Sequence, residues 1–281
     1  VLDGREGTAV VWENNTLGIP EGSLLGRPAA TLRLDADGGM QVVAWRGGRY
    51  EATTASGAAV EAQVPSPADP IEVSGPWELT FPPGLGAPGS VTLPKLVSWT
   101  EHDEDGVRYF SGTATYSREL PVPASLLGEG RRVWLDLGRV KNLAQVQVNG
   151  TDLGVLWKPP FAVDVTDTLR PGENRLTVKV TNLWPNRLIG DDRLPEEDQR
   201  AVFGKDSPWS AFGNQGMRLA SWPEWLTEGR QRPETGRVTF TTWKHWSKDD
   251  ELLESGLLGP VKLRQTVIAP LSAGAGATGR P

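Results

Sequence analysis

The sequence of 281 residues contains no cysteine, so disulfide bonds and thiolate metal sites are excluded. It has only two histidines, which argues against a histidine-centred zinc site or catalytic triad. No apolar run approaches the roughly 20 residues that a membrane-spanning helix requires. The formal net charge is −6, and the basic residues are not clustered. We therefore expect neither a nucleic-acid partner nor a membrane partner.

The sequence also lacks an initiating methionine and a signal-peptide pattern, since it begins with Val1. We interpret it as an excised or mature fragment. Its length suffices for one large domain or two ordinary ones, with a sizeable core.

Turn-forming residues and tryptophan are abundant. The chain has 33 Gly and 23 Pro without a repeating period, which indicates many turns rather than a collagen-like structure. It has 12 Trp against 3 Tyr and 6 Phe. An indole can stack on the C–H face of a sugar ring, and turn-rich chains with many tryptophans are common among carbohydrate-binding β-sandwiches. The alternative is that most of these indoles fill a core.

Short strands with alternating apolar residues recur along the chain. The central run predicts four of them, at residues 146–150, 154–157, 161–167 and 171–180. A hairpin is predicted from 31–34 and 40–45 around the turn at 35–39. Further strands are predicted at 9–12, 50–54, 77–81, 110–116, 133–137, 238–243 and 260–268. Two short helices are plausible near 195–202 and 223–226.

These patterns predict an all-β chain, with an antiparallel jelly-roll β-sandwich of the galactose-binding type preceded by a partial β domain. We place the partial β domain and its proline-rich linker at residues 1–70 and the sandwich at 71–270. The sandwich contains a long loop insertion at 189–237, and a loop of that length is usually functional or disordered. Residues 271–281 form a small-residue tail, which we expect to be flexible.

The run from Asn149 to Val180 resembles the sugar-binding jelly roll of glycoside hydrolase family 2. The resemblance is carried by the following elements: Asn149-Gly150, Gly154, Pro160-Phe161, Asp164-Val165-Thr166-Asp167 and Pro171-Gly172-Glu173-Asn174. Residues 181–191, 236–243 and 255–261 are in turn similar to the C-terminal part of glycoside hydrolase family 106, the α-L-rhamnosidases. This similarity spans roughly residues 71–268, whereas residues 1–70 resemble only the preceding β region, weakly.

The resemblance implies a β-sandwich that flanks a catalytic (β/α) barrel of the same polypeptide. In that family the acid and base carboxylates lie on the barrel, which this chain does not contain. We therefore assign no catalytic residue. The resemblance also implies a secreted or periplasmic protein and a partner that is a rhamnose-containing glycan.

Six residues are candidates for carbohydrate binding. Trp157 and Lys158 place an indole and an ammonium on a loop stiffened by two prolines, although the indole could cap the sandwich instead. Trp184, Asn186 and Arg187 follow the last strand of the central run, and their polar groups suit sugar hydroxyls or a uronate carboxylate. They could equally tie down the long loop through hydrogen bonds to backbone. Trp243 is the sixth candidate.

Asp191 and Asp192 are the candidate ligands of a structural calcium ion, although adjacent aspartates without an Asp-x-Asp spacing are also typical of a solvated turn. No other cofactor is expected. The acidic run at 101–105 is interpreted as a solvated face.

Three functions remain open at this point. The first is a non-catalytic, carbohydrate-binding accessory region of an α-L-rhamnosidase-like glycoside hydrolase, and the second is a structural domain without a ligand site. The third is an independent carbohydrate-active enzyme on the sandwich face. An exposed Trp157 beside Asn186 and Arg187 favours the first, and burial of the candidate indoles favours the second. A deep cleft with two facing carboxylates favours the third.

Overall fold

The computed structural model describes residues 29–273 except 55, 199, 203–216 and 245. In that part of the chain the structure is all-β, with three short α-helices and three 3₁₀ turns. The strand predicted at 9–12 and all but the first three residues of the tail predicted at 271–281 lie outside the described residues. No helix among the described residues is both long and apolar enough to cross a bilayer.

One sheet of the sandwich has the strand order β12-β11-β14-β8-β6-β7 and is antiparallel throughout. Its strands are β6 (Trp77–Thr80), β7 (Ser90–Leu93), β8 (Thr113–Val122), β11 (Leu143–Val148), β12 (Thr151–Leu156) and β14 (Gly172–Thr181).

The facing sheet has the order β1-β2-β18-β9-β13, and β5 also pairs with β18. Its strands are β1 (Ala30–Leu34), β2 (Met40–Ala44), β5 (Ile71–Glu72), β9 (Arg131–Asp136), β13 (Ala162–Asp164) and β18 (Lys262–Pro270).

The remaining strands form three small sheets, in the orders β19-β4-β3, β10-β17 and β15-β16. They are β3 (Gly48–Thr53), β4 (Ala59–Val64), β10 (Arg139–Lys141), β15 (Arg200–Val202), β16 (Met217–Leu219), β17 (Gly256–Gly259) and β19 (Ser272–Ala273). The helices are α1 (Asp105–Arg108), α2 (Pro185–Asp191) and α3 (Glu224–Thr227), and the 3₁₀ turns are Trp99–Glu101, Ala124–Leu126 and Thr166–Thr168.

The main core lies between the two large sheets. Alternate residues of each strand point into it, as in β14, where Leu176, Val178 and Val180 are fully buried while Thr177 and Lys179 are only partly covered. This period of two is the reason that antiparallel strands with one apolar face pack as a sandwich. A second, smaller core lies under β1 to β4, and Val267 of β18 belongs to it.

Aromatic side chains occupy one region of the main core. The rings of Trp99 and Tyr116 stack at 6.4 Å, and the indole N–H of Trp99 donates to the Tyr116 hydroxyl at 2.6 Å. The backbone of Gly256 passes directly over this pair. A Cβ atom there would lie 2.6 Å from Trp99 Nε1 and 2.7 Å from the Tyr116 oxygen, and the φ of +101° also favours glycine.

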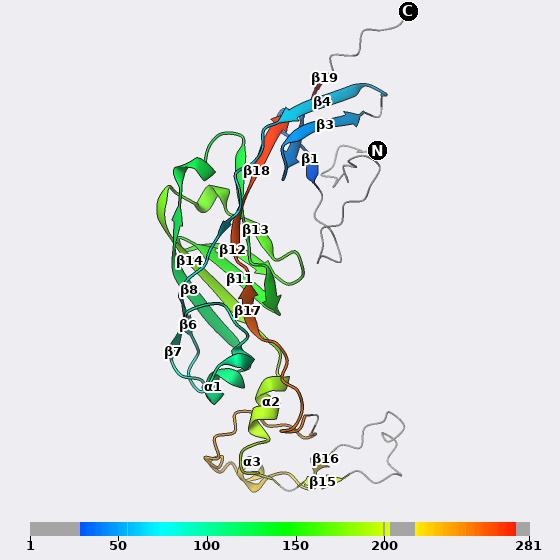
Figure 1. Cartoon of the computed structure of the whole chain (residues 1–281). Helices are drawn as coiled ribbons and strands as arrows, with labels where there is room; N and C mark the ends of the chain where they lie inside the picture. The colour runs from blue at the N-terminus through cyan, green and yellow to red at the C-terminus, as the bar shows by residue number, and fades with distance from the viewer. Residues whose placement is uncertain (1–28, 55, 199, 203–216, 245, 274–281) are drawn as a thin grey trace, which may run out of the picture.

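Figure 1 shows that the described part of the structure is elongated. The β3–β4 hairpin lies at one end, the sandwich lies in the middle, and α2, α3 and the β15–β16 pair lie at the other end. β18 runs from the sandwich into the region of β3 and β4, and it pairs with both β2 and β9. The domain boundaries at residues 70 and 270 stay predictions. The structure shows that β1 and β2 extend a sheet of the sandwich.

The four strands of the central run are confirmed as β11 to β14, and the N-terminal hairpin is confirmed as β1 and β2. The helix near 223–226 is confirmed as α3. Two predictions are wrong. The described residues of 195–202 form no helix, because Arg200–Val202 pairs with Met217–Leu219. Residues 238–243 form no strand, because the amides of Val238 and Thr239 donate to a carboxylate instead of to a neighbouring strand.

Candidate functional site

Two candidate regions lie at the same end of the sandwich. The register of the sheet pairs Leu156 of β12 with Ala144 of β11, and Ala144 in turn with Val180 of β14. Neighbouring strands are about 4.8 Å apart, so Leu156 and Val180 stand about 10 Å from each other in one row. Both β12 and β14 end just after this row. The segments beginning at Trp157 and Asn182 therefore leave the sheet side by side.

This end of the sandwich exposes large apolar side chains. The exposed fractions are 68% for Trp157 and 55% for Trp184, and Leu183 beside Trp184 is 52% exposed. Leu143, which pairs with Thr181 in the last row of the sheet, is also exposed. We refer to Leu143, Trp157, Leu183 and Trp184 as the aromatic end. An apolar surface rimmed by polar groups is typical of a binding site or an interface.

The Trp157 loop connects the edge strand β12 to β13. The Nζ atom of Lys158 lies 5.3 Å from the centre of the Trp157 indole, so the ammonium covers part of one face of the ring. At the far end of the loop, Phe161 is buried and its carbonyl accepts a hydrogen bond from Leu137 at 2.8 Å. An anchored loop that carries an exposed indole is a suitable platform for a ring-shaped ligand.

Asn186 and Arg187, predicted as sugar ligands, are buried inside helix α2, with exposed fractions of 1% and 6%. The Asn186 amide donates to the Leu253 carbonyl at 2.7 Å and to the Ser255 hydroxyl at 2.9 Å, and it accepts from the Leu253 amide at 2.8 Å. Their burial matches the alternative interpretation, in which these residues tie down the loop. Their role in ligand binding stays a prediction.

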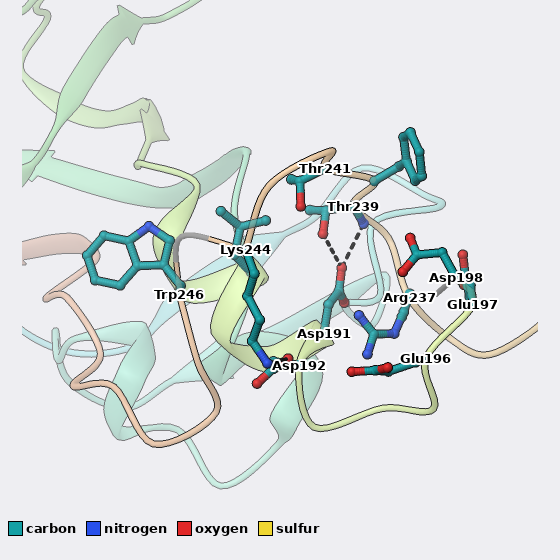
Figure 2. A pocket seen from close by; sticks show the side chains of 12 residues that line it. Asp191, Asp192, Glu196, Glu197, Asp198, Arg237, Thr239, Thr241, Lys244 and Trp246 are labelled. Carbon is teal, nitrogen blue, oxygen red and sulfur yellow. Dashed lines mark hydrogen bonds and ion pairs between the residues drawn. The ribbon is translucent and has the colours of Figure 1, made fainter. Parts of the chain in front are cut away.

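Arg187 forms a buried ion pair with Asp191 one helical turn later. Its Nε atom lies 2.9 Å from Asp191 Oδ1, at an angle too bent for a good hydrogen bond. The other oxygen of Asp191 accepts three hydrogen bonds, from the Val238 amide at 3.0 Å, the Thr239 amide at 2.7 Å and the Thr239 hydroxyl at 2.6 Å. Figure 2 shows this carboxylate facing the 238–241 segment. Asp191 thus fastens the C-terminal end of the long loop to α2.

Asp192 points elsewhere. Lys244 Nζ lies 2.6 Å from one of its oxygens, and the amide of Lys248 donates to the other at 2.9 Å. Both aspartates therefore hold proton donors, whereas a calcium ion needs six to eight free oxygen ligands. Among the described residues no group of three or more acidic or histidine side chains is arranged to hold a metal ion. The calcium site stays a prediction.

A small cavity lies beside these aspartates, between α2 and the 237–246 segment (Figure 2). Its volume of about 30 Å³ admits one or two waters and no pyranose ring. Five carboxylates surround it, those of Asp191, Asp192, Glu196, Glu197 and Asp198. Glu197 is held by the hydroxyl of Thr235 and by Arg232 Nε, the latter at 2.7 Å. This cavity offers paired carboxylates without room for a glycosidase substrate.

Trp243 is only partly exposed and lies just after the long loop. Of the six candidate carbohydrate-binding residues, the structure therefore brings Trp157, Lys158 and Trp184 to one sandwich end, with Trp157 and Trp184 largely exposed. It buries Asn186 and Arg187 beneath that end. Sequence reasoning missed Leu143 and Leu183. Their exposure depends on how β11 pairs with β14, two strands that are neighbours in the sheet but not in the sequence.

Comparison with known proteins gives one family match. A family model described as "Glycosyl hydrolases family 2, sugar binding domain" matches residues 44–207, more than half of the chain.

The chain is also similar to individual proteins. It is 40% identical over 261 residues to a Formosa agariphila protein named "Putative beta-glucuronidase", a match that covers 91% of the chain and 21% of that protein. The chain thus spans about a fifth of this curated relative. Among solved structures, a rhamnosidase from Novosphingobium sp. PP1Y matches with 26% identity and a TM-score of 0.53, over 86% of this chain and 24% of that one. A Ruminococcus gnavus beta-glucuronidase matches at 18% identity and a TM-score of 0.43, over 72% of this chain and 30% of that one.

Proposed function

The chain belongs to the family of glycosyl hydrolase family 2 sugar-binding domains, and from this premise we propose that it is a non-catalytic accessory region of a larger glycoside hydrolase. In this proposal the aromatic end binds a rhamnose-containing glycan. Trp157 carries the proposal, because its indole is 68% exposed on an anchored loop with an ammonium beside it. A deoxy sugar such as rhamnose has an apolar face that suits an indole, and its hydroxyls suit the Lys158 donor.

The assignment to an α-L-rhamnosidase of the family 106 type is part of the proposal. It is supported by the motifs at 181–191, 236–243 and 255–261 and by the likeness to the Novosphingobium rhamnosidase, which extends over most of the chain. The 40% identity to the Formosa agariphila protein supports a glucuronide as the alternative sugar. In either case we expect weak binding, with a Kd roughly between millimolar and tens of micromolar, because one aromatic platform contributes most of the contact.

A second function is favoured by Leu183 and Trp184, whose large exposed side chains adjoin the buried α2 anchor. Since the chain covers 21% of its curated relative, the aromatic end could instead be covered by the rest of a longer polypeptide, such as a catalytic barrel. The domain would then be structural, without a ligand site of its own. The third possibility, an enzyme on the sandwich face, finds no support in the narrow carboxylate-lined cavity.

The test is a titration of the 281-residue chain with L-rhamnose, rhamnose-containing oligosaccharides and glucuronides, followed by intrinsic tryptophan fluorescence. The matched variants are Trp157→Ala and Trp222→Ala, because Trp222 is 58% exposed but lies outside the aromatic end. Saturable quenching that is lost only in Trp157→Ala supports the proposal. No response to any glycan at about 50 mM, well above the expected Kd, would favour the structural domain.

A further inference from the structure

The outer face of the sheet formed by β12, β11, β14 and β8 adjoins the aromatic end. Ala144, Val146 and Val148 of β11 are fully buried, so the residues that alternate with them point away from the core. The register of the neighbouring strands then defines two outward-facing rows. The first row runs through Val155, Gln145, Lys179 and Thr115, and the second through Leu143, Thr181 and Thr113. We refer to these seven residues as the outer rows.

The outer rows are continuous with the aromatic end. Leu143 belongs to both, and continuing the β11–β12 register by one residue places Trp157 opposite Leu143. Val155, two residues before Trp157 on the edge strand β12, is 55% exposed. An exposed apolar strip therefore borders the polar part of the outer rows, as is typical of a binding surface.

The outer rows carry hydrogen-bonding groups that suit a sugar. The hydroxyls of Thr113 and Thr181 lie 2.7 Å apart on the exposed surface and share a hydrogen bond. The amide N–H of Gln145 donates to Asp152 at 2.6 Å, which orients the side chain. Its carbonyl oxygen accepts no hydrogen bond within the described residues. Hydroxyl and amide groups of this kind pair with the hydroxyls of a pyranose.

Lys179 is the one charged residue of the outer rows. Its cross-strand neighbours are Gln145 and Thr115, and its ammonium forms no ion pair within the described part of the chain. Of the carboxylates on this face, that of Asp152 holds Gln145, and Glu78 stands two strands away on β6. The whole chain has a net charge of −6, yet this ammonium is left unpaired. An unpaired ammonium among neutral hydrogen-bonding groups suits an anionic group of a ligand.

The indole of Trp157 and the ammonium of Lys179 belong to different parts of one surface. Lys179 lies two strands from β12 and two residues along from the row of Leu143, so the Cα atoms of Trp157 and Lys179 are about 12 Å apart. A ligand that contacts both side chains is longer than one pyranose ring. Trp157 is 68% exposed, and its printed ring contact is with Lys158 alone, so one face of the indole is open to such a ligand.

We infer that the outer rows extend the aromatic end into a site for an acidic oligosaccharide, in which Lys179 pairs with the carboxylate or sulfate ester of the second sugar. The first sugar stacks on Trp157, and the second lies over Leu143 and Thr181. This inference rests on the proposed function, in that a sugar occupies the aromatic end. It adds the chemical class of the neighbouring sugar.

The test compares three disaccharides that share a rhamnose unit. They are glucuronosyl-rhamnose, glucosyl-rhamnose, and glucosyl-rhamnose with a sulfate ester on the glucosyl unit. Heteronuclear NMR of the 281-residue chain follows the indole N–H signal of Trp157, which is identified by its loss in Trp157→Ala.

The variants for affinity are Lys179→Gln and, as the matched control, Lys262→Gln. Lys262 is likewise a partly buried strand residue without an ion pair among the described residues, but it lies on β18 of the facing sheet. Both changes remove one positive charge, so a general effect of net charge on binding would be equal in the two variants.

The expected result is that at least one acidic disaccharide binds about tenfold more tightly than glucosyl-rhamnose at low salt. Lys179→Gln should abolish this preference and leave binding of glucosyl-rhamnose within about twofold, whereas Lys262→Gln should leave all affinities within about twofold. Tighter binding of the glucuronosyl form would identify a carboxylate as the anionic group, and tighter binding of the sulfated form would identify a sulfate ester.

Three outcomes would overturn the inference. They are equal affinities for the acidic and neutral disaccharides, a preference for acidic disaccharides that survives Lys179→Gln, and equal losses in the two lysine variants. In each of these cases a saturable shift of the Trp157 signal would leave the proposed function standing. No shift with any disaccharide at about 50 mM would remove both the inference and the proposed function.

Discussion

The buried side chain of Asn186 and the backbone of Leu253 exchange two hydrogen bonds, of 2.7 and 2.8 Å, between α2 and the segment that leads into β17. The amide side chain takes the place of a strand partner for a residue that lies outside any sheet. Because α2 carries Trp184 at its N-terminal cap, this contact also positions half of the aromatic end.

Asn186→Ala should therefore destabilise the chain strongly. The change removes three hydrogen bonds and leaves the Leu253 amide without its side-chain acceptor. At about 1 kcal/mol for each hydrogen bond, we expect a loss of about 3 kcal/mol in the free energy of unfolding. Urea denaturation measures this loss. The neighbouring exposed change Trp184→Ala should cost less than about 0.5 kcal/mol. Equal costs for both changes would contradict the anchoring role of Asn186.

Gly256→Ala should lower the stability of the fold by more than the positive φ of this residue alone would cause. The added Cβ would lie 2.6 Å from the Trp99 indole nitrogen in the aromatic core. Gly154→Ala is the matched control, because Gly154 also has a positive φ, of +88°, but faces open space. We expect about 1 kcal/mol for the control and about 3 kcal/mol or more for Gly256→Ala, measured by thermal or urea unfolding. Similar losses at the two sites would contradict the steric argument.

Burial raises the pKa of the Tyr116 phenol, although donors from Leu257 and Trp99 act in the opposite direction. The unfolded phenol loses its proton near pH 10, whereas the folded one retains it at higher pH. Unfolding above about pH 10 thus releases a proton, and stability falls as pH rises, by up to about 1.4 kcal/mol per pH unit.

The comparison with Tyr116→Phe isolates this effect. Its stability should lack the corresponding alkaline slope, while below about pH 9 the phenol adds no pH dependence to either protein. Urea midpoints measured from about pH 8 to pH 11 give both slopes. Parallel slopes in the two proteins would show that Tyr116 does not titrate on unfolding.

Asp191→Asn should loosen the long loop while the sandwich stays folded. The change removes the charge opposite Arg187 and weakens the acceptor of three donors from Val238 and Thr239. Limited proteolysis should cut within residues 195–240 at least about tenfold faster than in the unaltered chain. Asp103→Asn, in an exposed turn, is the control.

The same carboxylate predicts the response to calcium. Since four proton donors surround Asp191, adding about 5 mM calcium or removing it with EDTA should shift the melting temperature by less than about 1 °C. A larger calcium-dependent rise that Asp191→Asn abolishes would instead establish the calcium site predicted from the adjacent aspartates.

The strands could be predicted from the sequence because their apolar residues alternate. Leu176, Val178 and Val180 sit two residues apart, and all three are buried in β14. The same logic gave a wrong strand at 238–243, where the alternation is present but the amides bond to Asp191. The periodicity of a segment does not show that a carboxylate from α2, more than 40 residues earlier, will bind its amides.

The candidate site was only partly predictable for a similar reason. Exposed Trp157 follows from a rigid loop after an edge strand, and the sequence marks that loop with Pro159 and Pro160. The burial of Asn186 depends on Leu253, which lies far away in the chain and carries no sequence signal that points to α2. The sequence therefore left open whether Asn186 binds a ligand or anchors the helix, and the structure adds the hydrogen bonds of the second kind.

β18 occupies the centre of its sheet, between β2 and β9, although it comes late in the sequence. β2 and β9 leave the ribosome long before β18 is synthesised. Each of the two strands therefore has an unpaired edge during synthesis. The sheet and the smaller core containing Val267 can be completed only after translation has passed residue 270. The nascent chain is consequently most prone to aggregate in the interval before that point.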